Sequence, residues 1–264
     1  MNRLPVWFIS HGGGPWPWVG GMREAHGGLE AALREIPRAS GSPKAVLVAT
    51  AHWEEEAFTF SSGAAPGMIH DYGGFPAHTY QVRYPAPGAP DLAAHAADLL
   101  ARRGLAARLD ADRGFDHGTF VPLHVMWPDA DVPVVQMSMR RDLDPAAHLE
   151  AGEALAELRD AGVLVVGSGL SYHNLGRLGP AGRASSATFD SWLQETVTAS
   201  GATDRAQRLE AWATAPMARV AHPREEHLLP LHIAVGAAGA DPGTCAYREE
   251  EVLGGWTVAN FRFG

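Results

Sequence analysis

Short runs of apolar, often β-branched residues alternate with longer Ala/Leu-rich stretches along this chain, and this alternation limits the fold more than any other feature. The apolar runs have the length and the Val and Ile content of buried strands, which predicts strands at residues 6–10, 45–51, 132–138, 163–167 and 256–263. The Ala/Leu-rich stretches space their apolar residues as helices do, which predicts helices at residues 29–36, 90–103, 145–160, 186–199 and 225–238. The pattern indicates an α/β fold with a central, mostly parallel or mixed β-sheet flanked by helices on both faces.

Composition and charge exclude several classes of function. With 46% hydrophobic and 19% charged residues over 264 positions, the chain can bury a sizeable core, and disorder is not indicated. Its net charge of −9 and the absence of any Lys/Arg run disfavour nucleic-acid binding, since a phosphate backbone would be repelled. The first apolar run is too short to span a membrane and lacks a signal-peptide cleavage pattern, so we expect a cytoplasmic protein without membrane attachment.

Cysteine usage restricts the kinds of metal site that are available. Cys245 is the one cysteine, so neither an intrachain disulfide nor a Cys-rich zinc site can form. The chain has 13 histidines. Any metal must therefore be held by histidines and carboxylates.

Three histidines come just after predicted strands. His11 directly follows residues 6–10, His52 directly follows residues 45–51, and His173 comes shortly after residues 163–167. In open α/β sheets ligands bind at the carboxyl ends of the strands, so these side chains should converge on one crevice. A lone histidine after a strand is more often a plain loop residue; the prediction depends on the joint pattern.

Two further segments combine histidine with acidic residues. His117 precedes an apolar helix, where Asp116 can orient its ring, and His227 opens the helix predicted at residues 225–238, beside Glu226. Acids also favour the first turn of any helix, so Glu226 alone is weak support for a site. Two more histidines lie in the Gly/Pro-rich loop at residues 62–90 and can line a pocket: His70 and His78. Three others lie in Ala/Leu-rich helical stretches, and we expect them to be surface or packing residues: His26, His95 and His148.

Seven segments occur in the order typical of one enzyme family. They are SHGGGP (10–15), AHWEE (51–55), IHDYGGFP (69–76), YPAPG (84–88), GFDHGTFVPL (114–123), SGLSYHNL (168–175) and EEHLLPLHIAVGA (225–237). With these segments the chain resembles the class III extradiol ring-cleavage dioxygenases of the LigB type, most closely their 4,5-DOPA dioxygenase-like branch. The resemblance implies a single catalytic domain over residues 1–264.

The resemblance also implies roles for individual residues. His11, His52 and His227 would hold a divalent metal, with Glu226 as the alternative third ligand. His173 would be the acid/base residue and His117 a second catalytic residue that lines the pocket. Iron(II) is expected for activity. Zinc(II) can occupy the same site and then draw in His173 as a fourth ligand.

In the expected reaction, dioxygen cleaves the ring of a small aromatic diol. Direct reaction of triplet dioxygen with a catechol is spin-forbidden, and a redox metal with open positions removes that barrier. The aromatic candidates for stacking on the ring are Tyr72, Phe75, Trp16 and Trp53, and the candidates for pairing with a substrate carboxylate are Arg224 and Arg83. Two other functions use the same histidines: a zinc-dependent hydrolase, and a metal-binding protein without catalysis. Oligomeric state is not predicted.

Overall fold

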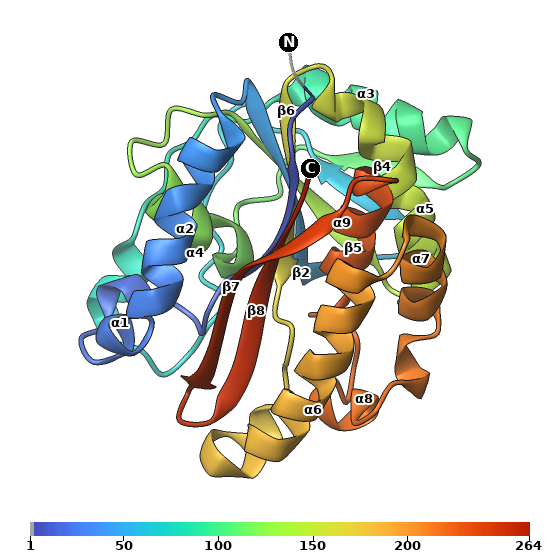
Figure 1. Cartoon of the computed structure of the whole chain (residues 1–264). Helices are drawn as coiled ribbons and strands as arrows, with labels where there is room; N and C mark the ends of the chain where they lie inside the picture. Colours follow the sequence, from blue (N-terminus) through green and yellow to red (C-terminus); the bar gives the residue numbers. More distant parts are fainter. Residues whose placement is uncertain (1–2) are drawn as a thin grey trace.

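A computed structural model describes residues 3–264 and contains one eight-stranded mixed sheet with helices on both faces (Figure 1). The strand order is β4-β3-β5-β2-β6-β1-β8-β7. The strands are β1 (Val6–Ser10), β2 (Ala45–Glu55), β3 (Phe58–Ser61), β4 (Ala107–Asp110), β5 (Val134–Arg140), β6 (Val163–Gly169), β7 (Gly243–Val252) and β8 (Trp256–Phe263). The predicted α/β fold is confirmed.

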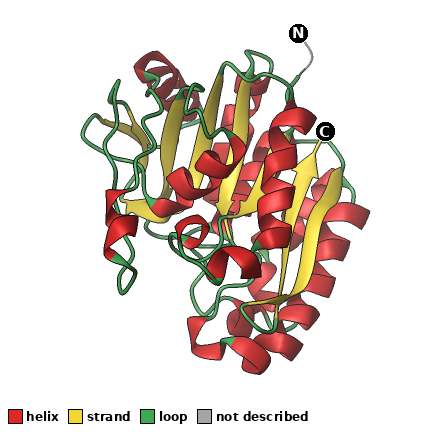
Figure 2. Cartoon of the chain, turned by 90° about the vertical axis from the view of Figure 1, so that its left-hand side faces the viewer, coloured by secondary structure: helices red, strands yellow, loops and turns green. Residues whose placement is uncertain are grey.

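The middle of the sheet is parallel, and its edges include antiparallel strands (Figure 2). Strands β5, β2, β6 and β1 pair in parallel, so their carboxyl ends lie at one edge of the sheet. On one side, β1 pairs antiparallel with β8, and β8 with β7. The long β7–β8 hairpin extends past its neighbours at that same edge (Figure 1).

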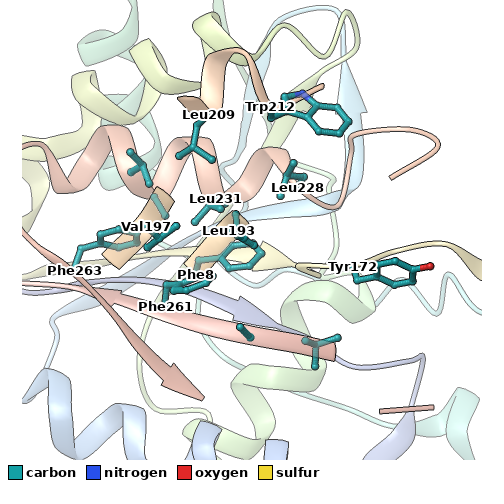
Figure 3. Packing of buried hydrophobic residues seen from close by; sticks show 14 of the residues in the cluster. Phe8, Tyr172, Leu193, Val197, Leu209, Trp212, Leu228, Leu231, Phe261 and Phe263 are labelled. Atoms are coloured by element: carbon teal, nitrogen blue, oxygen red, sulfur yellow. The ribbon is translucent and has the colours of Figure 1, made fainter. Parts of the chain in front are cut away.

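Both faces of the parallel strands are buried, which explains their continuous apolar runs. In β1, Val6 and Phe8 belong to the core under one layer of helices, and Trp7 and Ile9 to the core on the opposite face. Figure 3 shows the first of these clusters, in which Phe8 packs with side chains of β8 and of the helical segments above it.

The helices pack in two layers. They are α1 (Met22–Ala25), α2 (Gly27–Ser40), α3 (Pro90–Arg102), α4 (His117–Met126), α5 (Pro145–Leu155), α6 (Arg183–Gln194), α7 (Ala202–Glu210), α8 (Ala218–Ala221) and α9 (Leu229–Ala238). Short 3₁₀ turns lie at Trp16–Trp18, Ala77–Gln81, Ala156–Arg159, Leu175–Arg177, Gly179–Gly182 and Trp212–Thr214, and a π-helical turn at Glu195–Ala199. Helices α2 and α4 cover one face, and α3, α5, α6 and α9 cover the other.

Two predicted boundaries were wrong in ways that matter for the site. Strand β2 continues to Glu55, with an irregular register between Ala49 and Glu54, so His52 lies inside the strand rather than after it. Helix α9 begins at Leu229 instead of residue 225, with Pro230 in its first turn, where a missing N–H costs nothing. His227 therefore lies in the turn before the helix. None of the helices formed by residues 3–264 has the length and apolar character that a membrane crossing requires.

Candidate metal centre

Five histidines from distant parts of the sequence meet at the carboxyl edge of the parallel strands. The ring of His52 lies with its centroid 4.9 Å from that of His11, 3.9 Å from that of His117 and 4.9 Å from that of His227. The ring of His173 stacks on that of His227, with a centroid separation of 3.5 Å. All the histidines to which the sequence analysis assigned a role are thus neighbours in space.

The ligand atoms of these side chains form two adjoining groups. His11, His52 and His117 each offer an atom within 4.8 Å of the others, and so do His173, Glu226 and His227. The expected third ligand, His227, lies in the second group, while His117 lies in the first. The assignment of ligands within the cluster stays a prediction.

The spacing of two ring nitrogens suits a shared cation. The Nε2 atoms of His11 and His52 are 3.2 Å apart. Two nitrogens that each lie about 2.0–2.1 Å from one metal ion, at angles between square and tetrahedral, are separated by roughly 3 Å. The pair already has the separation that a common metal would impose.

Hydrogen bonds to the opposite ring nitrogen fix which atom of each ring faces the centre. Ser168 Oγ donates to the carbonyl of Gly118, so it accepts from Nδ1 of His11 at 3.3 Å. Nδ1 of His227 donates to Oε1 of Glu226 at 3.0 Å. With the proton held on Nδ1, Nε2 keeps its lone pair, as in most histidine metal ligands.

One carboxylate, that of Asp71, lies behind two of the imidazoles. Its Oδ1 accepts from Nδ1 and from the backbone N–H of His117, both at 2.9 Å, and its Oδ2 lies 3.3 Å from Nδ1 of His52. Burial opposes ionisation, but the hydrogen bond and charge of His117 outweigh it and lower the pKa of Asp71 to about 2. Asp71 was not among the predicted site residues, although the segment IHDYGGFP contains it.

The expectation that Asp116 orients the ring of His117 was wrong. Asp116 is the N-cap of α4 and accepts from the backbone N–H of Thr119 at 3.1 Å. Its second oxygen pairs with Arg113 at 2.8 Å. Asp116 therefore stabilises the start of the helix that carries His117, and Asp71 takes the orienting contact.

Glu226 contacts both histidines of the second group. Its Oε1 lies 3.0 Å from Nδ1 of His227 and 3.4 Å from Nδ1 of His173. Burial disfavours the ionised carboxylate, but the contact with His173 reverses this and the pKa of Glu226 is lowered. In this position the carboxylate orients two rings from behind.

Close backbone packing fixes the position of His227. A Cβ atom on Gly169, at the end of β6, would lie 2.1 Å from the carbonyl oxygen of His227. The next residue, Leu170, donates its backbone N–H to that same oxygen at 3.0 Å. Only glycine allows the turn before α9 to approach the strand so closely.

Burial keeps the central imidazoles neutral. Desolvation, followed by the charges of neighbouring histidines, holds the pKa of His11 and of His227 well below the usual value. The same causes lower the pKa of His52 to about 3. Neutral imidazoles with free Nε2 lone pairs form a donor set that fits a divalent metal ion of the iron or zinc type.

A cavity of about 180 Å³ opens onto this cluster. Its walls are formed by His11, Gly12, Gly13, Gly14, His26, His52, His117, Leu170, His173, Leu175, His227, Val252, Leu253 and Trp256. His26, which we expected to be a surface or packing residue, lines the cavity, whereas His70 and His78 do not.

The aromatic residues expected to stack on a substrate do not line the cavity either. Trp16 is fully buried, and its Nε1 donates to the backbone carbonyl of His11 at 2.9 Å. A Cβ on Gly12, which has φ +78°, would lie 2.4 Å from this indole nitrogen, so the glycines of this turn permit the close approach. Tyr72, Phe75 and Trp53 also lie outside the walls, and the aromatic side chain present there is Trp256 of the β7–β8 hairpin.

The fold and the site together define a class of protein: an α/β enzyme that binds a metal through histidines at the carboxyl edge of its sheet. Residues 6–259 match the family described as the catalytic LigB subunit of aromatic ring-opening dioxygenase. The chain belongs to this LigB family.

Individual relatives agree with the family assignment. The chain is 41% identical to a protein of Beta vulgaris named 4,5-DOPA dioxygenase extradiol, over 90% of this chain and 88% of the relative. It is 36% identical to an Escherichia coli protein of the same name, over 92% and 89% of the two chains. A fungal relative from Hapsidospora irregularis, named Dioxygenase tasH, is 38% identical over 95% of this chain and 83% of its own length.

A solved structure has the same fold. The crystal structure of an uncharacterized protein from Escherichia coli K12 superposes with a TM-score of 0.79 at 27% identity, covering 99% of this chain and 100% of that one. The predicted resemblance to LigB-type extradiol dioxygenases, which are metal-dependent oxidoreductases, is confirmed. This membership leaves little support for the hydrolase and for the non-catalytic alternative.

Proposed function

We propose that this protein cleaves the ring of a small catechol-type diol with dioxygen at an iron(II) ion held by His11, His52 and His227. The observation that carries the proposal is the cluster of imidazoles, with Nδ1 atoms hydrogen-bonded outward, around a cavity of ligand size. Residues 1–264 would act as one catalytic domain, in the cytoplasm.

A bound ferrous ion would supply two things that the chain lacks: open positions for both oxygens of the diol and for dioxygen, and an electron path between them. The neutral charge of the three imidazoles leaves the full charge of the ion available to favour loss of a diol proton. Zinc fits the same donors but has no redox chemistry, so a zinc-loaded protein should not consume dioxygen.

His173 is the proposed acid/base residue. Its ring lies flat against that of His227, and the Nδ1 atom faces Glu226, so Nε2 is the atom that faces the cavity. From there it can take a proton from the diol and return it later in the reaction. If zinc(II) bound instead, Nε2 of His173 would be the atom available as a fourth ligand.

His117 is the proposed second catalytic residue. It is 7% exposed and opens α4, and Asp71 holds its Nδ1 atom. Its ring lies 5.4 Å from that of His11, and its ligand atom belongs to a different group from that of His173. A proton at Nε2 of His117 can therefore reach the substrate from a second direction.

The apolar part of the wall limits the access of water. Leu170, Val252 and Trp256 are each less than 10% exposed and line the cavity beside the histidines. A substrate ring that fills this space would displace the remaining water, which strengthens every charge interaction at the centre.

The test is oxygen uptake with a panel of catechols by protein loaded anaerobically with iron(II) or with zinc(II). Iron-loaded protein should consume dioxygen, and zinc-loaded protein should not. His173→Ala should keep the metal and lower turnover by about a hundredfold or more. His95→Ala, an exposed change on α3, is the control and should alter neither.

Two results would contradict the proposal. An iron-loaded protein that consumes no dioxygen with any catechol would refute the reaction. A His173→Ala protein that loses its metal would refute the acid/base assignment and make His173 a ligand.

A further inference from the structure

The walls of the cavity combine imidazoles with apolar side chains. Leu170 and Leu175 come from the segment after β6, and Val252, Leu253 and Trp256 come from the β7–β8 hairpin. Within residues 3–264, no Lys, Arg, Asp or Glu contributes to these walls. The three glycines of the turn after β1 add backbone groups but no formal charge. A charged group on a ligand would find no side chain of opposite charge.

Several arginines close to wall residues have partners of their own. Arg224 forms a bidentate ion pair with Glu54 and lies 3.5 Å from Glu226. Arg183 pairs with Glu251 of the hairpin at 2.8 Å. Arg177, two residues after Leu175, has its guanidinium 3.5 Å from the carbonyl of Ala181.

Arg83, the other arginine considered for a substrate carboxylate, lines a separate pocket with Pro66 and Tyr84. Neither Arg83 nor Arg224 is therefore placed to bind a substituent within the cavity.

His26 makes the cavity still less favourable to an anion. Its Nδ1 donates to the backbone carbonyl of Met22 at 2.7 Å, which leaves a lone pair on Nε2. His26 is 2% exposed, its Nε2 has no partner, and burial lowers its pKa, so the ring stays neutral. A neutral ring offers no positive charge with which a carboxylate in the cavity could pair.

Resting on the proposed ring cleavage, we infer that this site selects catechols with an uncharged, apolar substituent and disfavours catechols that carry a carboxylate. An ionised carboxylate that leaves water beside these walls loses hydration and gains no ion pair with a Lys or Arg side chain. An apolar substituent gains free energy by covering apolar surface. Leu175 offers such surface, since it lines the cavity and is 64% exposed.

The matched substrates for the test are dihydrocaffeate and its methyl ester, which share the ring and the chain length and differ in charge. Oxygen uptake by iron-loaded protein at neutral pH gives kcat/KM for each. We expect the ester to be preferred by about tenfold or more, because a partnerless carboxylate is costly to desolvate.

Two variants locate the cause of the preference. Leu175→Arg places a cation in the wall and should lower the ratio of ester to acid by at least about threefold, because the acid then gains an ion pair. Leu178→Arg adds the same charge at a residue that is 52% exposed and outside the walls, and should leave the ratio unchanged. Both positions are on the surface, so folding should be preserved.

The outcomes separate the inference from the proposed function. Equal or better cleavage of the acid by the unmodified protein would overturn the inference alone. A preference for the acid that disappears in Arg177→Gln would overturn it too, and would identify Arg177 as a carboxylate-binding residue. If no catechol at all supports oxygen uptake, the proposed function fails and the inference fails with it.

Discussion

Replacement of Asp71 by Asn changes the shared carboxylate while keeping its shape. In the unmodified protein, Oδ1 of Asp71 accepts a hydrogen bond from Nδ1 of His117 at 2.9 Å, and Oδ2 lies 3.3 Å from Nδ1 of His52. If the amide oxygen of Asn stays with His117, its NH₂ group faces His52. Two donors cannot face each other, so the proton of His52 would move from Nδ1 to Nε2. Nε2 would then have no lone pair for a metal.

The expected size of the effect follows from the contacts that are lost. A hydrogen bond to a charged group contributes about 1.5–3 kcal/mol, and the contact with His52 is long, so the lower part of that range applies. Loss of a carboxylate behind a ligating histidine typically weakens metal binding about 10–100-fold. Both estimates predict that Asp71→Asn binds iron(II) or zinc(II) at least about tenfold more weakly, or about 1.4 kcal/mol.

A competition titration with a chelator measures this affinity directly. Asp98→Asn makes the same chemical change at an exposed position of α3 and should leave the affinity unchanged. Circular dichroism checks that both variants are folded. A folded Asp71→Asn protein with the affinity of the unmodified protein would refute the reasoning, because packing alone would then orient the two rings.

The remaining predictions concern stability. Burial lowers the pKa of His148 to about 3, and its Nε2 accepts the backbone N–H of Arg140 at 3.1 Å, so the folded protein binds the extra proton of this residue more weakly than the unfolded chain does. His148 should therefore stabilise the folded state fully above pH about 6.5, and its share of the free energy of unfolding should fall by about 1.4 kcal/mol per pH unit below that, down to pH about 3. Urea unfolding at several pH values should show this slope reduced in His148→Gln, and an identical slope in both proteins would contradict the assignment. Gly169→Ala should cost about 1–3 kcal/mol in unfolding experiments and weaken metal binding, because its Cβ would displace the backbone of His227. Gly27→Ala, whose Cβ would meet nothing within 4 Å, is the control, and equal effects of the two changes would contradict the packing argument.

The elements that the sequence predicted well are those with a clear burial pattern. The strand predicted at residues 6–10 is β1, because both of its faces are covered and every residue is apolar or small. Helix α3 was predicted to within one residue, since its apolar positions recur on one face. Strand β7 was missed, because its segment GTCAYREEEV is mostly exposed, contains four charged residues, and becomes a strand through pairing with β8. The short β3 and β4 at the opposite edge gave no pattern long enough to detect.

Within the site, the residues that could be predicted are those that follow the carboxyl ends of predicted strands. His11 and His173 follow strands whose direction the sequence already implied, so their convergence could be expected. Asp71 lies in the Gly/Pro-rich loop at residues 62–90, which has no periodic pattern. It reaches His117 because Met68 and Phe115 form an isolated parallel bridge, and the two segments that follow them lie side by side. Such a bridge leaves no trace in composition or spacing, and the same is true of the hairpin that forms the apolar wall.

The distance along the chain between His11 and His227 has a consequence for biosynthesis. The two residues are 227 − 11 = 216 positions apart, yet their rings lie 5.3 Å from each other. A cation that needs both can be captured only after the ribosome has released nearly the entire polypeptide and its final segments have docked. Cells short of the metal would then accumulate apoprotein whose resistance to unfolding is lower by about 2.7 kcal/mol than at a hundredfold excess over the dissociation constant. The supply of the metal would thereby set how long each newly made molecule stays folded.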